Sequence, residues 1–211
     1  MPSKKLKTPV LPDKYYHIFN RANNNELIFK EHEDFQFFMT KLGELVTDKI
    51  DIYCFCLMPN HFHMLIKPKY DVKRKGEGSF IESLKKLFQM HVQYFNKKYQ
   101  RKGSLFYKSY RRIEIKDESY LKYLVFYIHY NAQKANLVPH YSDYQYSSYR
   151  FFLNNKETKL RKDVVLSWFD DDINEFEIFH KECLEWLTGK GTPALGLESL
   201  LLLPLSKSQP L

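Results

Sequence analysis

Two β-strand patterns separated by only three residues constrain the fold of this chain more than any other feature. Ile50–Leu57 is rich in apolar residues, and His61–Lys67 follows Met58-Pro59-Asn60, whose proline and asparagine are typical of a turn. We therefore expect an antiparallel hairpin. Because alternate residues of a strand point to the same face of a sheet, His61 and His63 are predicted to lie side by side.

Paired imidazoles on one sheet face suit a divalent metal, and the same pattern also describes two exposed histidines without a ligand. Cys54 and Cys56 on the preceding strand add a further interpretation, a Cys₂His₂ zinc site. Their spacing differs from that of the usual zinc sites, and strand cysteines are commonly small core residues. We therefore favour a core role for both cysteines.

The order of the predicted elements indicates the fold class. Strand, helix, strand, strand, helix, strand is the ferredoxin-like split βαβ pattern, an α+β fold with an antiparallel sheet, and one further helix follows it. Beside the hairpin, the pattern predicts strands at Lys14–Ala22 and Leu105–Ile115 and helices at Glu31–Thr47, Ser79–Lys98 and Asp117–Ala135, with Asn136 as a left-handed cap.

Composition suggests four segments. We expect a basic arm at 1–13, a main domain at 14–153, a helical extension at 154–187 with an amphipathic stretch at Ile173–Leu187, and a disordered tail at 188–211. The polar stretch at 70–78 is predicted to be a loop. Neither a signal peptide nor a membrane span of about 20 apolar residues is evident, and three cysteines give no disulfide framework, so a cytoplasmic location fits.

Charge and aromatic content point to an anionic partner. The net charge is +8, and the chain holds 16 tyrosines and 17 phenylalanines. Nucleic acid is the commonest partner of such a chain, although the charge alone can serve solubility. The basic residues between positions 85 and 112 are Lys85, Lys86, Lys97, Lys98, Arg101, Lys102, Lys108, Arg111 and Arg112.

The predicted helix that ends near Ala135 places chemically useful groups on one stripe. Tyr123, Tyr127, Asn131 and Lys134 follow one another at helical spacing. A tyrosine hydroxyl can act as a nucleophile, and a carboxamide oxygen can ligate a hard cation. The same stripe is also compatible with an ordinary half-polar helix surface.

Together these motifs resemble those of the HUH-type single-tyrosine transposases, and most closely those of REP-associated tyrosine transposases. The similarity rests on the run from Met58 to His63 and on the run from Tyr127 to Val138. Asn20-Arg21, Gly103–Tyr110 and Tyr144–Tyr149 also match. It covers roughly residues 14–153 and continues more weakly to about Trp186. Ala132 and Asn136 replace the proline and glycine usual in that family, and both are compatible with the predicted helix and its cap.

The resemblance implies a DNA strand transferase. His61, His63 and Asn131 would hold a divalent metal, Mg²⁺ or Mn²⁺, and Tyr127 would attack a phosphate of single-stranded, hairpin-containing DNA. A 5′-phosphotyrosine intermediate and a free 3′-OH would result, so that strands can be rejoined without a nucleotide cofactor. Arg21 and the basic residues between 85 and 112 would contact phosphates, and Lys134 would either do the same or simply end the helix.

Two other functions remain open at this point. One is a non-catalytic nucleic-acid-binding module, because ferredoxin-like sheets also bind RNA through surface aromatics. The other is a two-tyrosine replication initiator, since Tyr123 and Tyr127 have the required spacing. The resemblance implies either a homodimer with shared sites or a monomer. The DNA target, the native metal, the biological role and the function of the tail are left undetermined.

Overall fold

The computed structural model describes residues 10–11, 14–69, 79–117, 120–154 and 156–190. The predicted basic arm lies almost entirely outside these residues, as do the predicted loop at 70–78 and the tail beyond 190. No helix among the described residues combines the length and apolar character needed to cross a bilayer.

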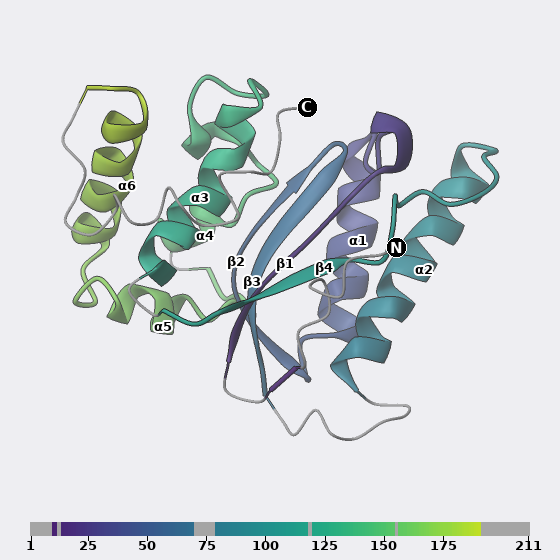
Figure 1. Cartoon of the computed structure of the whole chain (residues 1–211), viewed down its shortest axis with the longest axis horizontal. Helices are drawn as coiled ribbons and strands as arrows, with labels where there is room; N and C mark the ends of the chain where they lie inside the picture. The colour runs from purple at the N-terminus through teal and green to yellow at the C-terminus, as the bar shows by residue number, and fades with distance from the viewer. Residues whose placement is uncertain (1–9, 12–13, 70–78, 118–119, 155, 191–211) are drawn as a thin grey trace.

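A four-stranded antiparallel sheet forms the centre of the molecule (Figure 1). Its strands are β1 (Tyr15–Arg21), β2 (Ile50–Met58), β3 (His61–Pro68) and β4 (Arg111–Ile115), in the spatial order β2-β3-β1-β4. This order is that of the ferredoxin-like fold and confirms the predicted fold class. The predicted hairpin is β2–β3, and β1 lies between β3 and β4.

Helices α1 (His32–Leu45) and α2 (Phe80–Lys98) cover one face of the sheet (Figure 1). The buried Asp34 carboxylate joins them, because it accepts hydrogen bonds from the backbone amide of Lys30, from Lys98 and from the Tyr99 hydroxyl at 2.8–3.0 Å. Burial alone would raise the pKa of Asp34, but these donors outweigh it and lower the pKa below its ordinary value.

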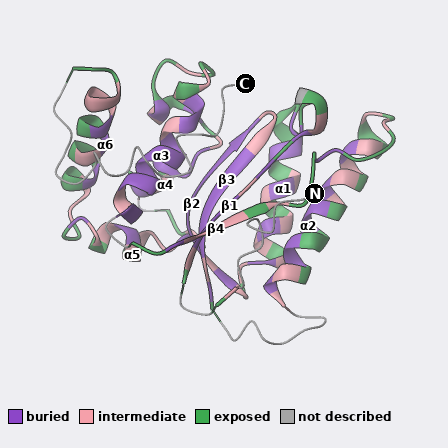
Figure 2. Cartoon of the chain, viewed as in Figure 1, coloured by how far each residue is buried: buried purple, intermediate pink, exposed green. Residues whose placement is uncertain are grey.

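The opposite face is covered by helices from the second half of the chain (Figure 1). They are α3 (Tyr120–Lys134), α4 (Tyr149–Phe152), α5 (Lys162–Ser167) and α6 (Ile173–Leu187), and short 3₁₀ helices lie at Asn23–Asn25 and Tyr141–Asp143. Figure 2 shows that α3 is buried along its length whereas α6 keeps an exposed outer side. A helix buried over most of its surface needs partners on more than one side, and α3 lies between the sheet and α6.

The end of α3 follows the predicted cap. Asn136 has φ 55°, and the Leu137 amide donates to the Ala132 carbonyl at 3.0 Å, which closes the last turn in a Schellman arrangement. Asparagine tolerates this left-handed conformation better than most residues, so it can stand where glycine is usual.

The predicted strand at Leu105–Ile115 is wrong in its first half, because the structure has a strand only at Arg111–Ile115. Leu105 and Phe106 are consecutive, and both are buried. Between the Phe106–Ala22 bridge and the Arg111–Phe19 pair, residues 107–110 lie opposite only residues 20–21 of β1, so the ladder is interrupted there. The segment is instead irregular and makes a single bridge from Phe106 to Ala22, just beyond the end of β1.

Candidate active site

The two histidines of the hairpin lie on the sheet face that α3 covers. The ring centroids of His61 and His63 are 5.2 Å apart, as strand alternation predicts. Phe62 between them points to the opposite face and packs on Phe38 and Phe88. The local sequence therefore places both imidazoles on one face and anchors the strand behind them in the core.

Hydrogen bonds orient both imidazoles. His61 Nδ1 lies 2.6 Å from Asn60 Oδ1, and because that oxygen can only accept, His61 donates. His63 Nδ1 lies 2.9 Å from Nε2 of His17, a buried residue of β1. Since the Nδ1 atom of each hairpin imidazole is engaged, Nε2 is the atom of each ring left for another partner.

Burial keeps the hairpin histidines neutral near physiological pH. The pKa of His61 falls to about 4, mainly through loss of hydration and to a smaller extent through the nearby cations Arg21 and Lys134. Burial also lowers the pKa of His63, with additional contributions from His17, His61 and Lys134. Neutral imidazole is the form that binds metals, so the environment suits ligation.

Tyr127 on α3 lies beside this pair. Its ring centroid is 6.0 Å from that of His63 and 6.5 Å from that of His17. The Lys134 ammonium lies 5.4 Å from the centre of the Tyr127 ring, and Asn131 Nδ2 donates to the Tyr127 carbonyl oxygen at 2.6 Å.

The stripe predicted on α3 consists of Tyr123, Tyr127, Asn131 and Lys134. The alternative interpretation, that it forms an ordinary half-polar helix surface, is wrong for three of these four residues. Tyr123, Tyr127 and Asn131 are only 6–7% exposed. The sheet lies on one side of α3 and α6 on the other, and helical spacing alone could not reveal that second cover. Lys134, at the end of the helix, is exposed.

The two tyrosines of the stripe have different surroundings. Tyr123 contacts Tyr120, Phe126 and Trp186 of α6, with ring centroids 5.8–6.4 Å apart. Burial raises its pKa to about 12, which disfavours the phenolate. Tyr127 is the tyrosine whose ring contacts the histidines.

Cys54 and Cys56 are both fully buried in the cluster beneath α3. Burial raises the pKa of each thiol, which disfavours the thiolate that zinc requires. Among the described residues, no three His, Cys, Asp or Glu side chains are grouped so that they could hold a metal. A metal at the histidine pair would therefore need an additional ligand of another type, such as the Asn131 carboxamide.

A buried hydrogen-bonded chain fixes the position of α3. His180 Nδ1 donates to the Phe176 carbonyl at 2.8 Å, and its Nε2 lies 3.0 Å from Nδ1 of His129. His129 Nε2 lies 2.8 Å from the Ser148 hydroxyl, which accepts a bond from the Phe55 amide. Both ring nitrogens of His180 and His129 and the Ser148 hydroxyl therefore have partners. This series of hydrogen bonds ties α6, α3 and β2 together at little desolvation penalty.

We predict that the free energy of unfolding falls below about pH 6.5. Burial lowers the pKa of His17 and His180 to about 3 and also lowers that of His63 and His129. These histidines therefore take up protons more readily in the unfolded chain than in the folded one. Their stabilisation of the folded protein is complete above the ordinary histidine pKa of 6.5, and it declines as the pH falls toward their lower pKa in the folded protein. Each such histidine contributes about 1.4 kcal/mol per pH unit. Urea denaturation at several pH values measures this, and an equal midpoint at neutral and mildly acidic pH would contradict it.

The basic residues predicted to bind DNA differ in their surroundings. Ion pairs within the chain hold Lys85 to Glu82, Lys98 to Glu31 and Asp34, and Arg101 to Glu26. Among the other basic residues, Lys86 and Lys97 are exposed on α2, and Lys102 is exposed just after it. Lys108 is exposed before β4, Arg111 is exposed on β4, and Arg112 is half-buried. Arg21 is exposed at the end of β1. Arg21 pairs with His61 in the sheet register, and Arg111 lies opposite Phe19, so these two flank the site.

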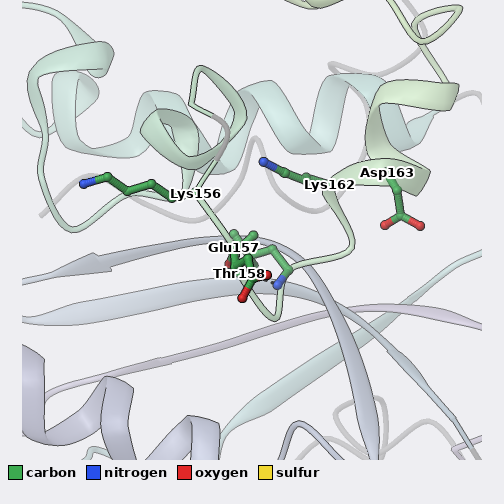
Figure 3. Close-up of a pocket in the computed structure, with 6 residues that line it drawn as sticks. Lys156, Glu157, Thr158, Lys162 and Asp163 are labelled. Atoms are coloured by element: carbon green, nitrogen blue, oxygen red, sulfur yellow. Dashed lines mark hydrogen bonds between the residues drawn. The ribbon is translucent and has the colours of Figure 1, made fainter.

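A surface pocket of about 430 Å³ lies elsewhere, on the segment between α4 and α5 (Figure 3). Lys156, Glu157, Thr158, Lys162 and Asp163 line it, and Leu160 of the same segment bridges to Ile52 near the start of β2. The histidine pair follows the other end of that strand. The pocket and the histidine–tyrosine constellation are therefore separate features.

Sequence reasoning missed His17. The strand predicted at Lys14–Ala22 carried Arg21 as its only site residue, although His17, Phe19 and Arg21 alternate along one face of it. The alternation was a usable signal, but only the pairing of β1 with β3 shows that this face is the one that carries His61 and His63.

Comparisons with known proteins decide the family. The model of the IS200-like transposases matches residues 11–131, which is more than half of the chain. The chain belongs to the IS200-like transposase family. The transposase class expected from its sequence is thereby confirmed.

A solved structure described as the REP-associated tyrosine transposase bound to a REP hairpin shares the fold. It has a TM-score of 0.57 at 12% identity, over 71% of this chain and 85% of that one. A Deinococcus radiodurans R1 protein described as a transposase candidate matches with 16% identity and a TM-score of 0.38, over 56% of this chain and 92% of that one. The latter score is too low to carry an argument. Comparison with curated proteins finds no match.

Proposed function

We propose that this transposase cleaves and rejoins single-stranded DNA through a covalent bond to Tyr127, with the help of a divalent metal at His61, His63 and Asn131. The observation that carries the proposal is the placement of the Tyr127 ring 6.0 Å from His63, on the face that presents both hairpin imidazoles. A nucleophile beside two neutral imidazoles is an arrangement that can support metal-assisted phosphoryl transfer.

The three side chains fit a divalent cation. His61 and His63 are neutral, and each has its Nδ1 atom engaged, so that Nε2 is the atom of each ring left to bind a cation. Asn131 uses its Nδ2 for the Tyr127 carbonyl, which leaves its carboxamide oxygen as a donor atom. Two imidazoles and one amide oxygen suit Mg²⁺ or Mn²⁺ with open positions for phosphate oxygens, where the cation would stabilise negative charge.

The chain's own residues supply the remaining chemistry. The Tyr127 hydroxyl oxygen forms a bond to the scissile phosphorus and loses its proton, while the bond to the 3′ oxygen of the preceding nucleotide breaks and that oxygen takes up a proton. A 5′-phosphotyrosine and a free 3′-OH result, and attack by another 3′-OH reverses the step. Lys134, above the Tyr127 ring, places a cation where the phosphate arrives.

His17 completes the proposal as a positioning residue. A ligand at Nε2 of His63 requires the proton of that ring on Nδ1, and His17 Nε2 lies 2.9 Å away to accept it. The two rings are stacked with centroids 5.1 Å apart, so His17 also sets the plane of His63.

The partner that fits is single-stranded or hairpin DNA. The relative of similar fold is described with a REP hairpin, and the cations Arg21 and Arg111 flank the site of this chain. Both lie on the face that carries His61 and His63. Phosphate contacts of this kind provide affinity and register, whereas they carry little sequence information.

We predict that DNA binding weakens at least tenfold between about 50 and 200 mM salt, because several cations contact phosphates and release counterions. Fluorescence anisotropy with a labelled hairpin measures the salt slope. Arg111→Gln should reduce that slope by about one contact, roughly 0.7. Lys156→Gln, in the separate pocket, is the matched control and should leave it unchanged. Affinity that does not respond to salt would contradict the prediction.

The experiment that tests the function is a search for the covalent adduct. The protein is incubated with labelled hairpin DNA with unpaired flanks and Mg²⁺ or Mn²⁺, and the products are separated on a denaturing gel. A labelled band at the mass of protein plus DNA, lost when the metal is chelated, is the expected result. Tight binding without any adduct would favour the non-catalytic binding module instead.

A further inference from the structure

Tyr107 is the exception in an aromatic-rich chain. Among the phenylalanine, tyrosine and tryptophan residues that the structure describes, it alone is exposed, at 45%. An isolated exposed ring needs no explanation by itself. In Tyr107, however, the rigid attachment of the backbone and the cations beside the ring do call for an explanation.

The backbone around Tyr107 is held firmly. The Tyr107 amide donates to the Arg21 carbonyl at 3.1 Å, and Asn20 Nδ2 donates to the Lys108 carbonyl at 3.2 Å. Phe106, immediately before it, is buried against Phe88, with centroids 5.5 Å apart. An exposed ring on such an anchored backbone is a fixed platform, and ordering it further on binding carries little entropy penalty.

The position of this platform relates it to the active site. The backbone carbonyl of Arg21 accepts the hydrogen bond from the Tyr107 amide, and Arg21 is the strand partner of His61 in the sheet register. The ring therefore stands at the end of β1 that lies opposite His61. A DNA strand whose phosphate reaches His61 and Tyr127 must place neighbouring nucleotides within reach of this end of the sheet.

Two cations flank the ring. The Arg21 guanidinium carbon lies 5.0 Å from the ring centre, and the Lys108 ammonium lies 4.9 Å from it. An exposed cation–π contact is weaker than a base stacked on an aromatic ring. A base can therefore take the place of a long flexible side chain over the ring, and the displaced cation can pair with the adjacent phosphate.

We propose that Tyr107, together with Arg21 and Lys108, forms a subsite that stacks one unpaired base beside the scissile phosphate. The inference rests on the proposed function, since it assumes single-stranded DNA at the histidine pair. Stacking tolerates any base because every base has a π-face, so the subsite would hold the strand in place without reading its sequence.

The test is a cycle of protein and DNA changes. The probe is a DNA hairpin with unpaired flanks of mixed sequence, and an abasic residue is placed at each flank position in turn. Tyr107→Leu should weaken binding about five- to a hundredfold, whereas Tyr107→Trp should preserve it. Leu153→Ala, which changes another side chain that is 45% exposed, is the matched control and should bind like the wild type.

One flank position should stand out in this cycle. There, the abasic residue should weaken binding by the wild type and have little further effect on Tyr107→Leu, because both changes remove the same contact. Equal binding by Tyr107→Leu and the wild type, or equal losses at all positions in both proteins, overturns the subsite. If the wild type forms the covalent adduct in that case, the proposed function stands and only the subsite fails. If it forms none, the proposed function fails separately.

Discussion

Tyr127→Phe is expected to abolish the covalent protein–DNA adduct and to leave DNA binding within about twofold of the wild type. The change removes only the hydroxyl, so the ring can still pack 6.0 Å from His63. The metal and the cations stabilise charge but cannot supply the attacking oxygen. A denaturing gel measures the adduct, and anisotropy with the same hairpin measures binding.

The matched control for this variant is Tyr123→Phe, one helical turn earlier. Its ring packs against Tyr120, Phe126 and Trp186 rather than against the histidines, so the variant should retain most of the adduct. The opposite pattern, with the adduct lost in Tyr123→Phe and kept in Tyr127→Phe, would show that the nucleophile is misassigned. Loss in both single variants would instead indicate the two-tyrosine mechanism.

His17→Phe is expected to weaken Mn²⁺ binding about 10- to 100-fold, the usual effect of losing a residue that orients a metal ligand. Phenylalanine has a similar volume and can stack on His63, but it cannot accept the proton that His63 must carry on Nδ1. The remaining N–H would be buried without an acceptor, so the ring would favour the tautomer that cannot bind the metal at Nε2.

Isothermal titration calorimetry with Mn²⁺ measures this affinity without any cleavage assay. His17→Gln serves as the conservative variant, because its side-chain oxygen can accept from His63, and it should bind within a few-fold of the wild type. The ¹⁵N shifts of the His63 ring in the metal-free proteins report the tautomer directly. Wild-type affinity and an unchanged His63 tautomer in His17→Phe would remove His17 from the site.

Local patterns were sufficient for much of the fold. The Met58-Pro59-Asn60 turn and the strands on either side of it predicted the hairpin, and alternation placed His61 and His63 on one face. The left-handed cap at Asn136 was predictable for the same reason. Each of these features depends on residues that are neighbours in the chain, where sterics and hydrogen bonding restrict the backbone to few choices.

The candidate site depends on contacts that no local pattern contains. His17 is 46 positions from His63 in the sequence, and only the pairing of β1 with β3 brings their nitrogens to 2.9 Å. The stripe of α3 was recognisable from spacing, but its burial depends on α6, which the His129–His180 bond attaches across 51 positions. Tyr107 likewise lies where the register between β1 and the segment before β4 is interrupted, which only the pairing of these distant segments reveals. Strand register and helix docking are settled by the packing of distant segments around one core, and so these relations exist only in the folded chain.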